Sequence, residues 1–279
     1  MTSPTRREAI QTGAALAVAS TFPADAHATQ PAARVPEGYP DQLSYAPGDE
    51  VKLHISATRC DLELFRVGAE RKSVWKQVGV DTKVHEVPKN ASSHGCDWPV
   101  AASFKIPADW PSGYYECRIS TQPPGQKEAV GTLFFVVRPK EPGKNAKILL
   151  QLATNTYNAY TNWGGYSLYA YHGRHKVQGR RVSFHRPQSS LFGRWEEPFV
   201  KWAEKAGYAL DFATNLDLEA RPDLLKGYKL VLSVGHDEYW SSPMRDALEK
   251  YIGKGGNVAF FSGNTCCWQV RTEDDGRAL

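Results

Sequence analysis

Four short, mainly apolar segments constrain the fold of this chain more than any other feature. They occupy residues 148–153, 209–213, 230–234 and 257–261. Continuous apolar runs of this length are typical of parallel strands buried on both faces. Segments with helical spacing of apolar residues lie between them, at 195–206, 218–225 and 242–252. This repeated strand–helix order predicts an α/β domain with a doubly wound parallel sheet, which we place at 146–279.

The region before this domain has a different pattern. Five short segments with strand-like character are separated by Pro, Gly, Asn and Ser. They lie at 50–56, 62–67, 104–106, 114–119 and 133–137. Short strands at this spacing predict an all-β, immunoglobulin-like sandwich over residues 39–138. The Pro-, Gly- and Lys-containing segment 139–145 is predicted to be a linker.

Residues 1–28 have the features of an export signal. Arg6 and Arg7 precede a weakly apolar segment, and Ala26-His27-Ala28 fits a signal-peptidase site. This predicts a twin-arginine signal cleaved after Ala28 and a periplasmic or extracellular protein. An ordinary secretory signal or a tail outside the fold is the alternative. The twin-arginine route carries folded proteins, which suits a protein that takes up a metal before export.

Composition excludes several classes of protein. The chain of 279 residues is 41% hydrophobic and 23% charged, which is globular rather than disordered. Its net charge of +4 comes with no basic stripe, so we expect no nucleic-acid partner. No apolar run approaches the roughly 18 residues of a membrane span. Export permits disulfides, but the sequence leaves any pairing among Cys60, Cys96 and Cys117 open.

The carboxyl ends of parallel strands are where open α/β sheets bind ligands. The third apolar run leads directly into His236-Asp237-Glu238. His236 can carry protons near neutral pH, and Glu238 can bind a hard metal or act as a base. In a structural alternative, Asp237 caps the next helix and Glu238 pairs with Arg245. Dinucleotide-binding, phosphate-loop and nucleophile-elbow motifs are absent from the sequence.

The segment after the first apolar run holds five tyrosines within residues 157–171. We expect it to be neither a regular helix nor a strand, and long irregular segments are usually functional. Three interpretations remain open: phenolate ligands for ferric iron, an aromatic wall for a sugar or organic substrate, and surface packing. We expect His172, His175 and His185 to be solvated loop residues rather than a metal cluster.

Several motifs together resemble a known family. They are YNAYTNWGG at 157–165, SLY at 167–169, GHDEYWS at 235–241, and GN with WQVR between 263 and 271. From about Ala146 to Arg271 the chain resembles the carboxy-terminal catalytic region of the N,N-dimethylformamidase large (beta) subunit family. The resemblance implies a glutamine-amidotransferase-like α/β fold. It also implies hydrolysis of an N-substituted formamide to an amine and formate at a mononuclear ferric iron.

In that family two tyrosinates and one glutamate hold the iron, and a nearby histidine is needed for activity. By resemblance, Glu238 is the carboxylate ligand and His236 the catalytic histidine. Tyr160 best matches the first tyrosinate, with Tyr157 as its rival, and Tyr169 best matches the second. The substrate-binding residues implied in the same way are Tyr157, Asn162, Trp163 and Asn264.

The family's catalytic domain continues beyond the point that matches Arg271, so we expect the α/β domain to be incomplete at its C-terminus. An exposed apolar edge near Phe260, Phe261 and Trp268, and poor solubility, should follow. The sequence therefore predicts an exported, metal-dependent hydrolase of C–N amide bonds acting on a small-molecule amide, or an inactive fragment of one. An exported carbohydrate- or small-molecule-binding module is the alternative, and a homo-oligomer or a small-subunit complex stays open.

Overall fold

The computed structural model describes residues 34–122, 124–221 and 223–279. The predicted export signal, residues 1–28, lies outside the described residues. All of the described residues belong to one compact unit. Within the described part of the chain, no helix is long and apolar enough to cross a membrane.

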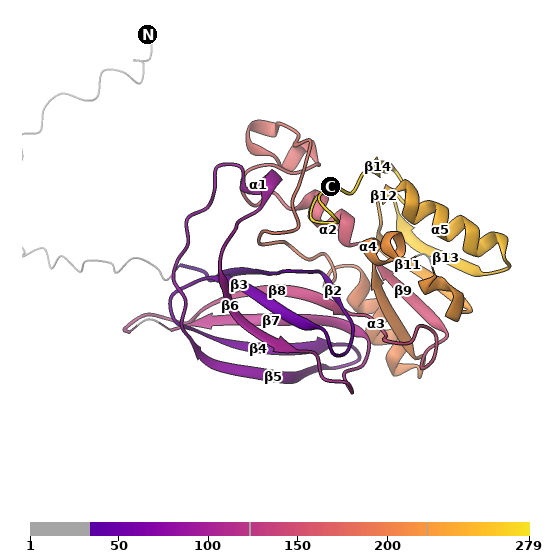
Figure 1. The fold of residues 1–279 in the computed structure, drawn as a ribbon, viewed down its shortest axis with the longest axis horizontal. Helices are drawn as coiled ribbons and strands as arrows, with labels where there is room; N and C mark the ends of the chain where they lie inside the picture. Colours follow the sequence, from indigo (N-terminus) through magenta and orange to yellow (C-terminus); the bar gives the residue numbers. More distant parts are fainter. Residues whose placement is uncertain (1–33, 123, 222) are drawn as a thin grey trace, which may run out of the picture. The chain divides into compact units, whose positions relative to one another are not determined.

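The first part of the chain forms two sheets with an apolar core between them (Figure 1). The five-stranded sheet has the order β2-β8-β7-β4-β5, with bounds Ser44–Tyr45, Ala129–Val137, Gly113–Thr121, Cys60–Val67 and Arg71–Val80. The three-stranded sheet has the order β1-β3-β6, with bounds Glu37–Pro40, Glu50–Ser56 and Val100–Lys105. Neighbours pair antiparallel except β2 and β8. A short helix, α1 (Ala91–His94), precedes β6.

Alternation explains this core. Val51, Leu53 and Ile55 on β3 are fully buried, while Glu50 and Lys52 between them face solvent. The strand predicted at 50–56 has the observed bounds, and the other four predicted strands lie within or at the end of longer observed ones. Strand β5 was not predicted, because most of its side chains are polar and it lies at the edge of its sheet.

The second part contains the predicted parallel sheet. Its order is β10-β9-β11-β13, with bounds Leu210–Thr214, Ile148–Leu152, Leu230–His236 and Asn257–Gly263, and every neighbouring pair is parallel. The helices are α2 (Thr154–Tyr160), α3 (Glu196–Lys205), α4 (Asn215–Ala220) and α5 (Ser242–Gly253). Short 3-10 turns occupy Ala170–His172, Arg174–Lys176 and Leu224–Gly227. A second parallel pair joins β12 (Tyr239–Ser241) to β14 (Trp268–Val270).

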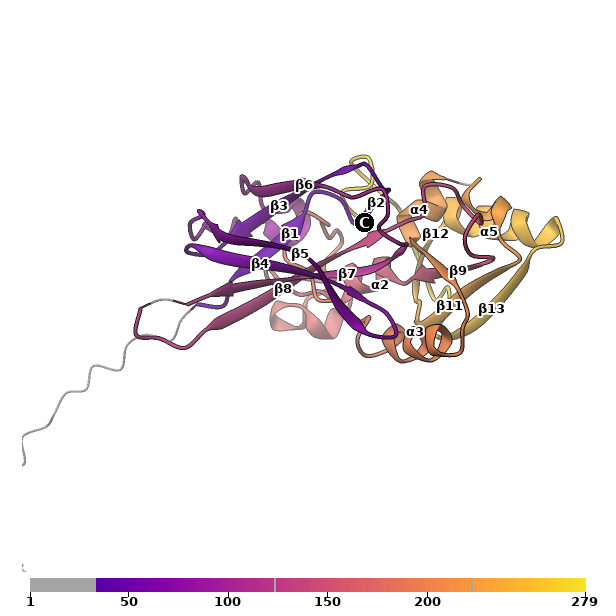
Figure 2. The ribbon, with the colours of Figure 1, turned by 90° about the horizontal axis from the view of Figure 1, so that it is seen from below.

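Helices cover both faces of this sheet, as Figure 2 shows for α3 and α5. Leu150 and Leu152 of β9 share one apolar cluster with Val200 of α3. Leu149, which points to the opposite face, shares another with Met244 of α5. The first cluster also contains Tyr114 and Phe134 of the antiparallel sheet. The two sheet systems are therefore packed against each other.

Two expectations about helices were wrong. The segment after β9 begins with the regular helix α2, and its N-terminus has no local side-chain cap. Instead Asn215 Oδ1 accepts a hydrogen bond from the N–H of Asn155 (2.8 Å). The helix predicted at 218–225 is replaced by α4, which begins at Asn215 because Thr214 and Asp217 form a capping box, and by a separate 3-10 turn at Leu224–Gly227.

The expected apolar edge is confirmed. Strand β13 pairs only with β11, and its other edge has no partner among the described residues. Phe260, Phe261 and Trp268 are 45%, 62% and 52% exposed. Phe199 of α3 extends this surface, with its ring centroid 6.1 Å from that of Phe261.

Candidate functional site

The carboxyl end of β11 carries the His236–Glu238 run. Strand β11 ends at His236 and β12 begins at Tyr239, so Asp237 and Glu238 form the turn between them. The backbone N–H of Glu238 donates to Thr156 Oγ1 on α2 (2.9 Å). The turn is therefore fixed against the helix that follows the neighbouring strand β9. This is the edge at which open parallel sheets bind ligands.

Asp237 points into the protein beneath this edge. Its side chain is fully buried and accepts hydrogen bonds from Gln151 Nε2 (2.7 Å) and Ser233 Oγ (2.7 Å). Burial raises the pKa of this carboxyl to about 6. Asp237 thus anchors the turn between the two strands.

The structural alternative for this run is wrong. Helix α5 is capped by Ser241, whose hydroxyl accepts the N–H of Met244 (3.4 Å). Arg245 binds Glu249 (2.7 Å) on its own helix. Neither Asp237 nor Glu238 therefore has the role that this alternative gives it.

Three of the predicted site residues converge. The hydroxyl of Tyr160, at the end of α2, donates to Glu238 Oε2 (2.5 Å) and lies 2.9 Å from His236 Nε2. The same imidazole nitrogen is 3.4 Å from Glu238 Oε2. Glu238 is buried and His236 is partly buried. We call Tyr160, His236 and Glu238 the edge triad.

The edge triad has the donors that a hard cation needs. Burial and the adjacent Glu238 carboxylate raise the pKa of Tyr160, so without a cation the phenol keeps its proton and donates it. The hydroxyl oxygen of Tyr160 and Oε2 of Glu238 lie 2.5 Å apart and share one proton. Tyrosine oxygen, carboxylate and imidazole suit iron. Over the described ranges, no group of three or more His, Cys, Asp or Glu side chains could hold a metal, so a metal here needs the tyrosines.

Aromatic rings surround the edge triad. The ring centroid of Tyr169 lies 4.8 Å from that of Tyr160 and 4.7 Å from that of His172. The indole of Trp195 lies over the His236 imidazole, with centroids 6.2 Å apart and planes 28° from parallel. Tyr169 is thus in ring contact with Tyr160, beside the triad.

The other predicted residues lie elsewhere. Tyr157 is buried in the core and donates a hydrogen bond to Glu196. Trp163 reaches the antiparallel sheets, where its Nε1 donates to Glu37 Oε1 (2.7 Å). Asn162 is exposed and donates to the carbonyl of His172 (3.1 Å). Asn264 follows β13 with a φ of 51°, one residue after Gly263, which is the register partner of His236 in the parallel sheet.

Sequence analysis missed three residues that hold this site. Thr156 binds the Glu238 turn, Trp195 covers His236, and Arg186 binds the backbone around Tyr160. Gly235, directly before His236, is the one sequence signal for the close packing of Trp195. It has a φ of 93°, and a Cβ there would lie 2.5 Å from Trp195 Cβ, so only glycine lets the indole approach.

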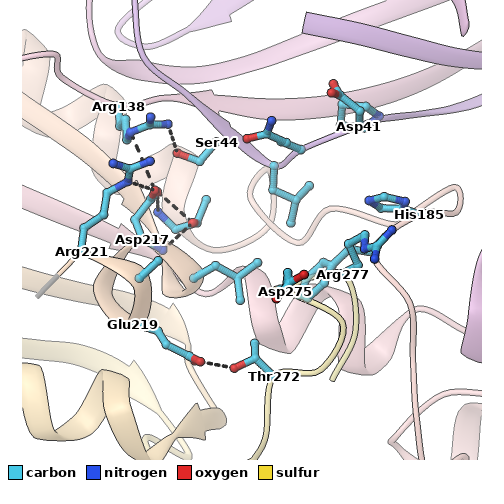
Figure 3. Close-up of a pocket in the computed structure, with 18 of the residues that line it drawn as sticks. Asp41, Ser44, Arg138, His185, Asp217, Glu219, Arg221, Thr272, Asp275 and Arg277 are labelled. Carbon is cyan, nitrogen blue, oxygen red and sulfur yellow. Dashed lines mark hydrogen bonds and ion pairs between the residues drawn. The ribbon is translucent and has the colours of Figure 1, made fainter. Parts of the chain in front are cut away.

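A separate cavity of about 760 Å³ lies between the first strands, α4 and the C-terminal segment (Figure 3). Its charged side chains face one another: Nε of Arg138 and Nε of Arg221 lie 4.0 and 3.8 Å from Asp217 Oδ1. Glu219 accepts a hydrogen bond from Thr272. None of the edge triad lines this cavity, so we assign it no part in the site.

The cysteines are all free thiols in the structure, and Cys60, Cys96 and Cys117 are buried. The pairing that the sequence left open among these three is therefore not observed. Burial raises the pKa of the Cys60 thiol to about 11, as expected of a side chain that packs as a small hydrophobe.

Comparisons with known proteins point to one family. A family described as "N,N-dimethylformamidase beta subunit-like, C-terminal" matches residues 60–278. The N,N-dimethylformamidase beta subunit of Alcaligenes sp. is 26% identical over 226 residues, which cover 64% of this chain and 29% of that protein. The same subunit of Paracoccus aminophilus is 30% identical over 222 residues, covering 63% and 28%. The chain thus spans less than a third of the length of these relatives.

Among solved structures, murine CRIg resembles 38% of this chain and 98% of its own, at 11% identity and a TM-score of 0.27, which is too low to carry an argument. The family match begins in β4, well before the start at Ala146 that the motifs indicated. It thus includes most of the antiparallel strands as well as the parallel sheet and the edge triad. The chain belongs to the N,N-dimethylformamidase beta subunit-like, C-terminal family.

Proposed function

We propose that this chain carries the catalytic site of an iron-dependent hydrolase of C–N amide bonds, with N-substituted formamides as its substrate class. The single observation that carries this proposal is the convergence of Tyr160, His236 and Glu238 at the carboxyl edge of the parallel sheet. Membership of the family supports it, since both curated relatives are N,N-dimethylformamidase beta subunits.

In this proposal Tyr160, Glu238 and Tyr169 hold one ferric iron. Bound iron supplies Lewis-acid polarisation of an amide carbonyl and acidifies water. Glu238 is fixed for its role through its backbone, which Thr156 binds. We assign Tyr169 as the second tyrosinate by the resemblance, and the contact between its ring and that of Tyr160 supports this assignment.

His236 is the proton carrier in this scheme. Its Nε2 lies within 3.4 Å of both Tyr160 and Glu238, beside the two proposed oxygen ligands. It accepts the proton of the attacking water and then donates it to the departing amine nitrogen. The indole of Trp195 stacks beside the imidazole, and the rings of Tyr160, Tyr169 and His172 pack against one another next to it.

The finer assignments of fold and location belong to the same proposal. We propose a glutamine-amidotransferase-like parallel sheet, an immunoglobulin-like sandwich, and export to the periplasm or exterior by a twin-arginine signal. Iron would then enter the folded protein before export. Small-molecule amides are the proposed partners.

The alternative is a binding module that stacks a glycan or another small molecule on its aromatic rings. It is favoured by Tyr171, which is 75% exposed and whose ring centroid lies 5.5 Å from that of Tyr169. The two proposals therefore differ in the residue on which they depend: catalysis depends on His236, and glycan binding depends on Tyr171.

The test is release of formate and dimethylamine from N,N-dimethylformamide by the iron-loaded chain. We expect release, and a loss of about 10²–10⁴-fold in His236→Ala with iron retained, because general acid–base catalysis contributes on that scale. His175→Ala, on the exposed loop, is the matched control and should keep full activity. Iron-loaded protein that releases no formate, but binds a glycan in a Tyr171-dependent way, would favour the binding module.

A further inference from the structure

Arg186 is fully buried. In the part of the chain that the structure describes, its hydrogen-bond partners are carbonyl and amide oxygens, with no carboxylate among them. Burial lowers its pKa to about 10, so it still carries its charge at neutral pH. Burying a charge without a counter-ion costs free energy, and such a residue is kept where its hydrogen bonds are needed.

The hydrogen bonds of Arg186 converge on one short segment. Nη1 donates to the carbonyl of Trp163 (2.8 Å), and Nη2 to the carbonyls of Asn158 (3.2 Å) and Thr161 (3.0 Å). Nη2 also reaches Asn158 Oδ1 (3.0 Å). The remaining donor, Nε, binds the carbonyl of Ser183 (3.0 Å).

This segment is the C-terminal turn of α2 and the loop after it. The last carbonyls of a helix have no partner within the helix, and a cation there also interacts favourably with the helix dipole. Tyr160 lies between Asn158 and Thr161, so the guanidinium binds the backbone on both sides of it. A lysine ammonium could not span these acceptors, because only the planar fork presents donors in several fixed directions.

We propose that Arg186 is a positioning residue, which ties the backbone of residues 158–163 so that the Tyr160 hydroxyl is held against Glu238 and His236. The proposal rests on the proposed function, because the orientation of Tyr160 matters to catalysis only if Tyr160 is a ligand. Arg186 does not itself touch the edge triad in any hydrogen bond of the structure. It acts through the backbone.

The test uses the full chain and Arg186→Lys, which keeps the charge and loses the fork. The first measurement is amide hydrogen exchange of the metal-free protein, followed by mass spectrometry. The second is affinity for redox-inert Ga³⁺, supplied as its nitrilotriacetate complex and followed by tyrosinate difference absorption. Arg181→Lys is the matched control, because Arg181 lies five residues earlier and binds Glu273, Asp274 and the carbonyl of Ser93.

In Arg186→Lys we expect faster exchange at 158–163, unchanged exchange in β7 and β8, and Ga³⁺ affinity lower by about 10–100-fold, the usual effect of removing an outer-shell partner. Arg181→Lys should change neither. Wild-type exchange at 158–163 in Arg186→Lys, or an equal effect of both substitutions, would overturn the proposal.

If Arg186→Lys does not fold, Asn158→Ala replaces it, since this removes one acceptor and leaves the guanidinium in place. Asn158→Ala should give smaller changes of the same kind in exchange and in Ga³⁺ affinity. Wild-type exchange at 158–163 in this variant would contradict the proposal that Arg186 holds this segment. A wild-type chain that binds neither Ga³⁺ nor iron contradicts the proposed function alone. The exchange experiment then still decides whether Arg186 holds the Tyr160 turn.

Discussion

The antiparallel sheets and the parallel sheet bury very different side chains. The core between the antiparallel sheets is almost wholly apolar, with Tyr115, Phe135 and Leu64 at its centre. Among the residues that the structure describes, 22 polar or charged side chains are buried, and 18 of these lie after residue 145. Many of these follow a strand of the parallel sheet, at the edge where Tyr160, His236 and Glu238 meet.

This difference separates stability from function. Buried polar groups cost free energy unless they are bonded, so a fold selected for stability alone avoids them. The antiparallel part follows this rule, whereas the parallel part keeps Glu196, Asp237 and Arg186 buried around the edge triad. We therefore expect substitutions in the first part to change stability, and those in the second to change pH dependence and metal binding.

The largest expected effect on stability lies in the antiparallel core. Phe135 is fully buried against Tyr45 and Tyr115, and Phe135→Ala should lower the free energy of unfolding by about 3–5 kcal/mol. Denaturant unfolding measures this, with Val78→Ala, at an exposed position of β5, as the control. A loss below about 1 kcal/mol would show that this core is not what stabilises the chain.

The next effect is a pH dependence that belongs to the parallel part. Burial raises the pKa of Glu196 from 4.5 to about 8, so the native state holds a proton that the unfolded chain has released. The stabilisation from this group is present below pH 4.5 and is lost as the pH rises through 8. The slope is on the order of 1 kcal/mol per pH unit.

Glu196→Gln replaces the carboxyl by an amide of the same shape that does not ionise. This variant should therefore show a smaller fall in stability between pH 5 and pH 8. Glu197→Gln, at the next position of α3, where the side chain instead binds Lys201, should leave that slope unchanged. The comparison is made by thermal unfolding at several pH values. Equal slopes in wild type and Glu196→Gln would contradict the account of this buried carboxyl.

A smaller effect is expected where the two parts meet. Glu204 on α3 accepts hydrogen bonds from Arg66 Nη2 (2.6 Å) and the N–H of Ala69 (2.7 Å) on the antiparallel side. Although burial opposes it, these bonds lower the pKa of Glu204. The stabilisation is therefore present above about pH 4.3, the ordinary glutamate pKa, and is lost as the pH falls.

Glu204→Gln should cost about 1–2 kcal/mol at pH 7, and this cost should shrink at pH 3. Urea unfolding at the two pH values measures it. Glu249→Gln, which breaks the exposed pair with Arg245, should cost less than about 0.5 kcal/mol. Equal losses of stability in both variants would mean that the Glu204 contact stabilises the chain no more than an ordinary surface ion pair does.

The smallest effect on stability is expected at the exposed edge of the parallel sheet. Phe261→Lys should change unfolding by less than about 0.5 kcal/mol, but should reduce self-association of the chain. Val78→Lys on β5 is the matched control, since β5 is also an edge strand but is rich in polar side chains. If light scattering falls equally in both variants, β13 has no special role in self-association.

Periodicity predicts the fold only where contacts are regular. The parallel strands followed from their mainly apolar segments, and β3 from its alternation. Helix α2 could not be predicted locally, because its N-terminal acceptor is Asn215, which is 60 residues away. Strand β5 was missed because an edge strand needs few apolar residues.

The candidate site was only partly visible in the sequence. The His236–Glu238 run stood out because ionisable residues directly after a buried strand are costly, and the resemblance added Tyr160 and Tyr169. The structure brings His236, Glu238 and Tyr160 together. Trp195, Thr156 and Arg186 act through contacts distant in the sequence, so no local pattern reveals them.

The central claim is that the edge triad binds ferric iron through Tyr160 and Glu238. The most direct test is the iron content and visible absorption of the full chain after expression in iron-replete medium. We expect bound iron with a tyrosinate charge-transfer band. Both should be lost in Glu238→Ala and kept in Glu249→Ala, which alters only an exposed helix pair. A colourless, iron-free wild-type protein, or a band that survives Glu238→Ala unchanged, would contradict the claim.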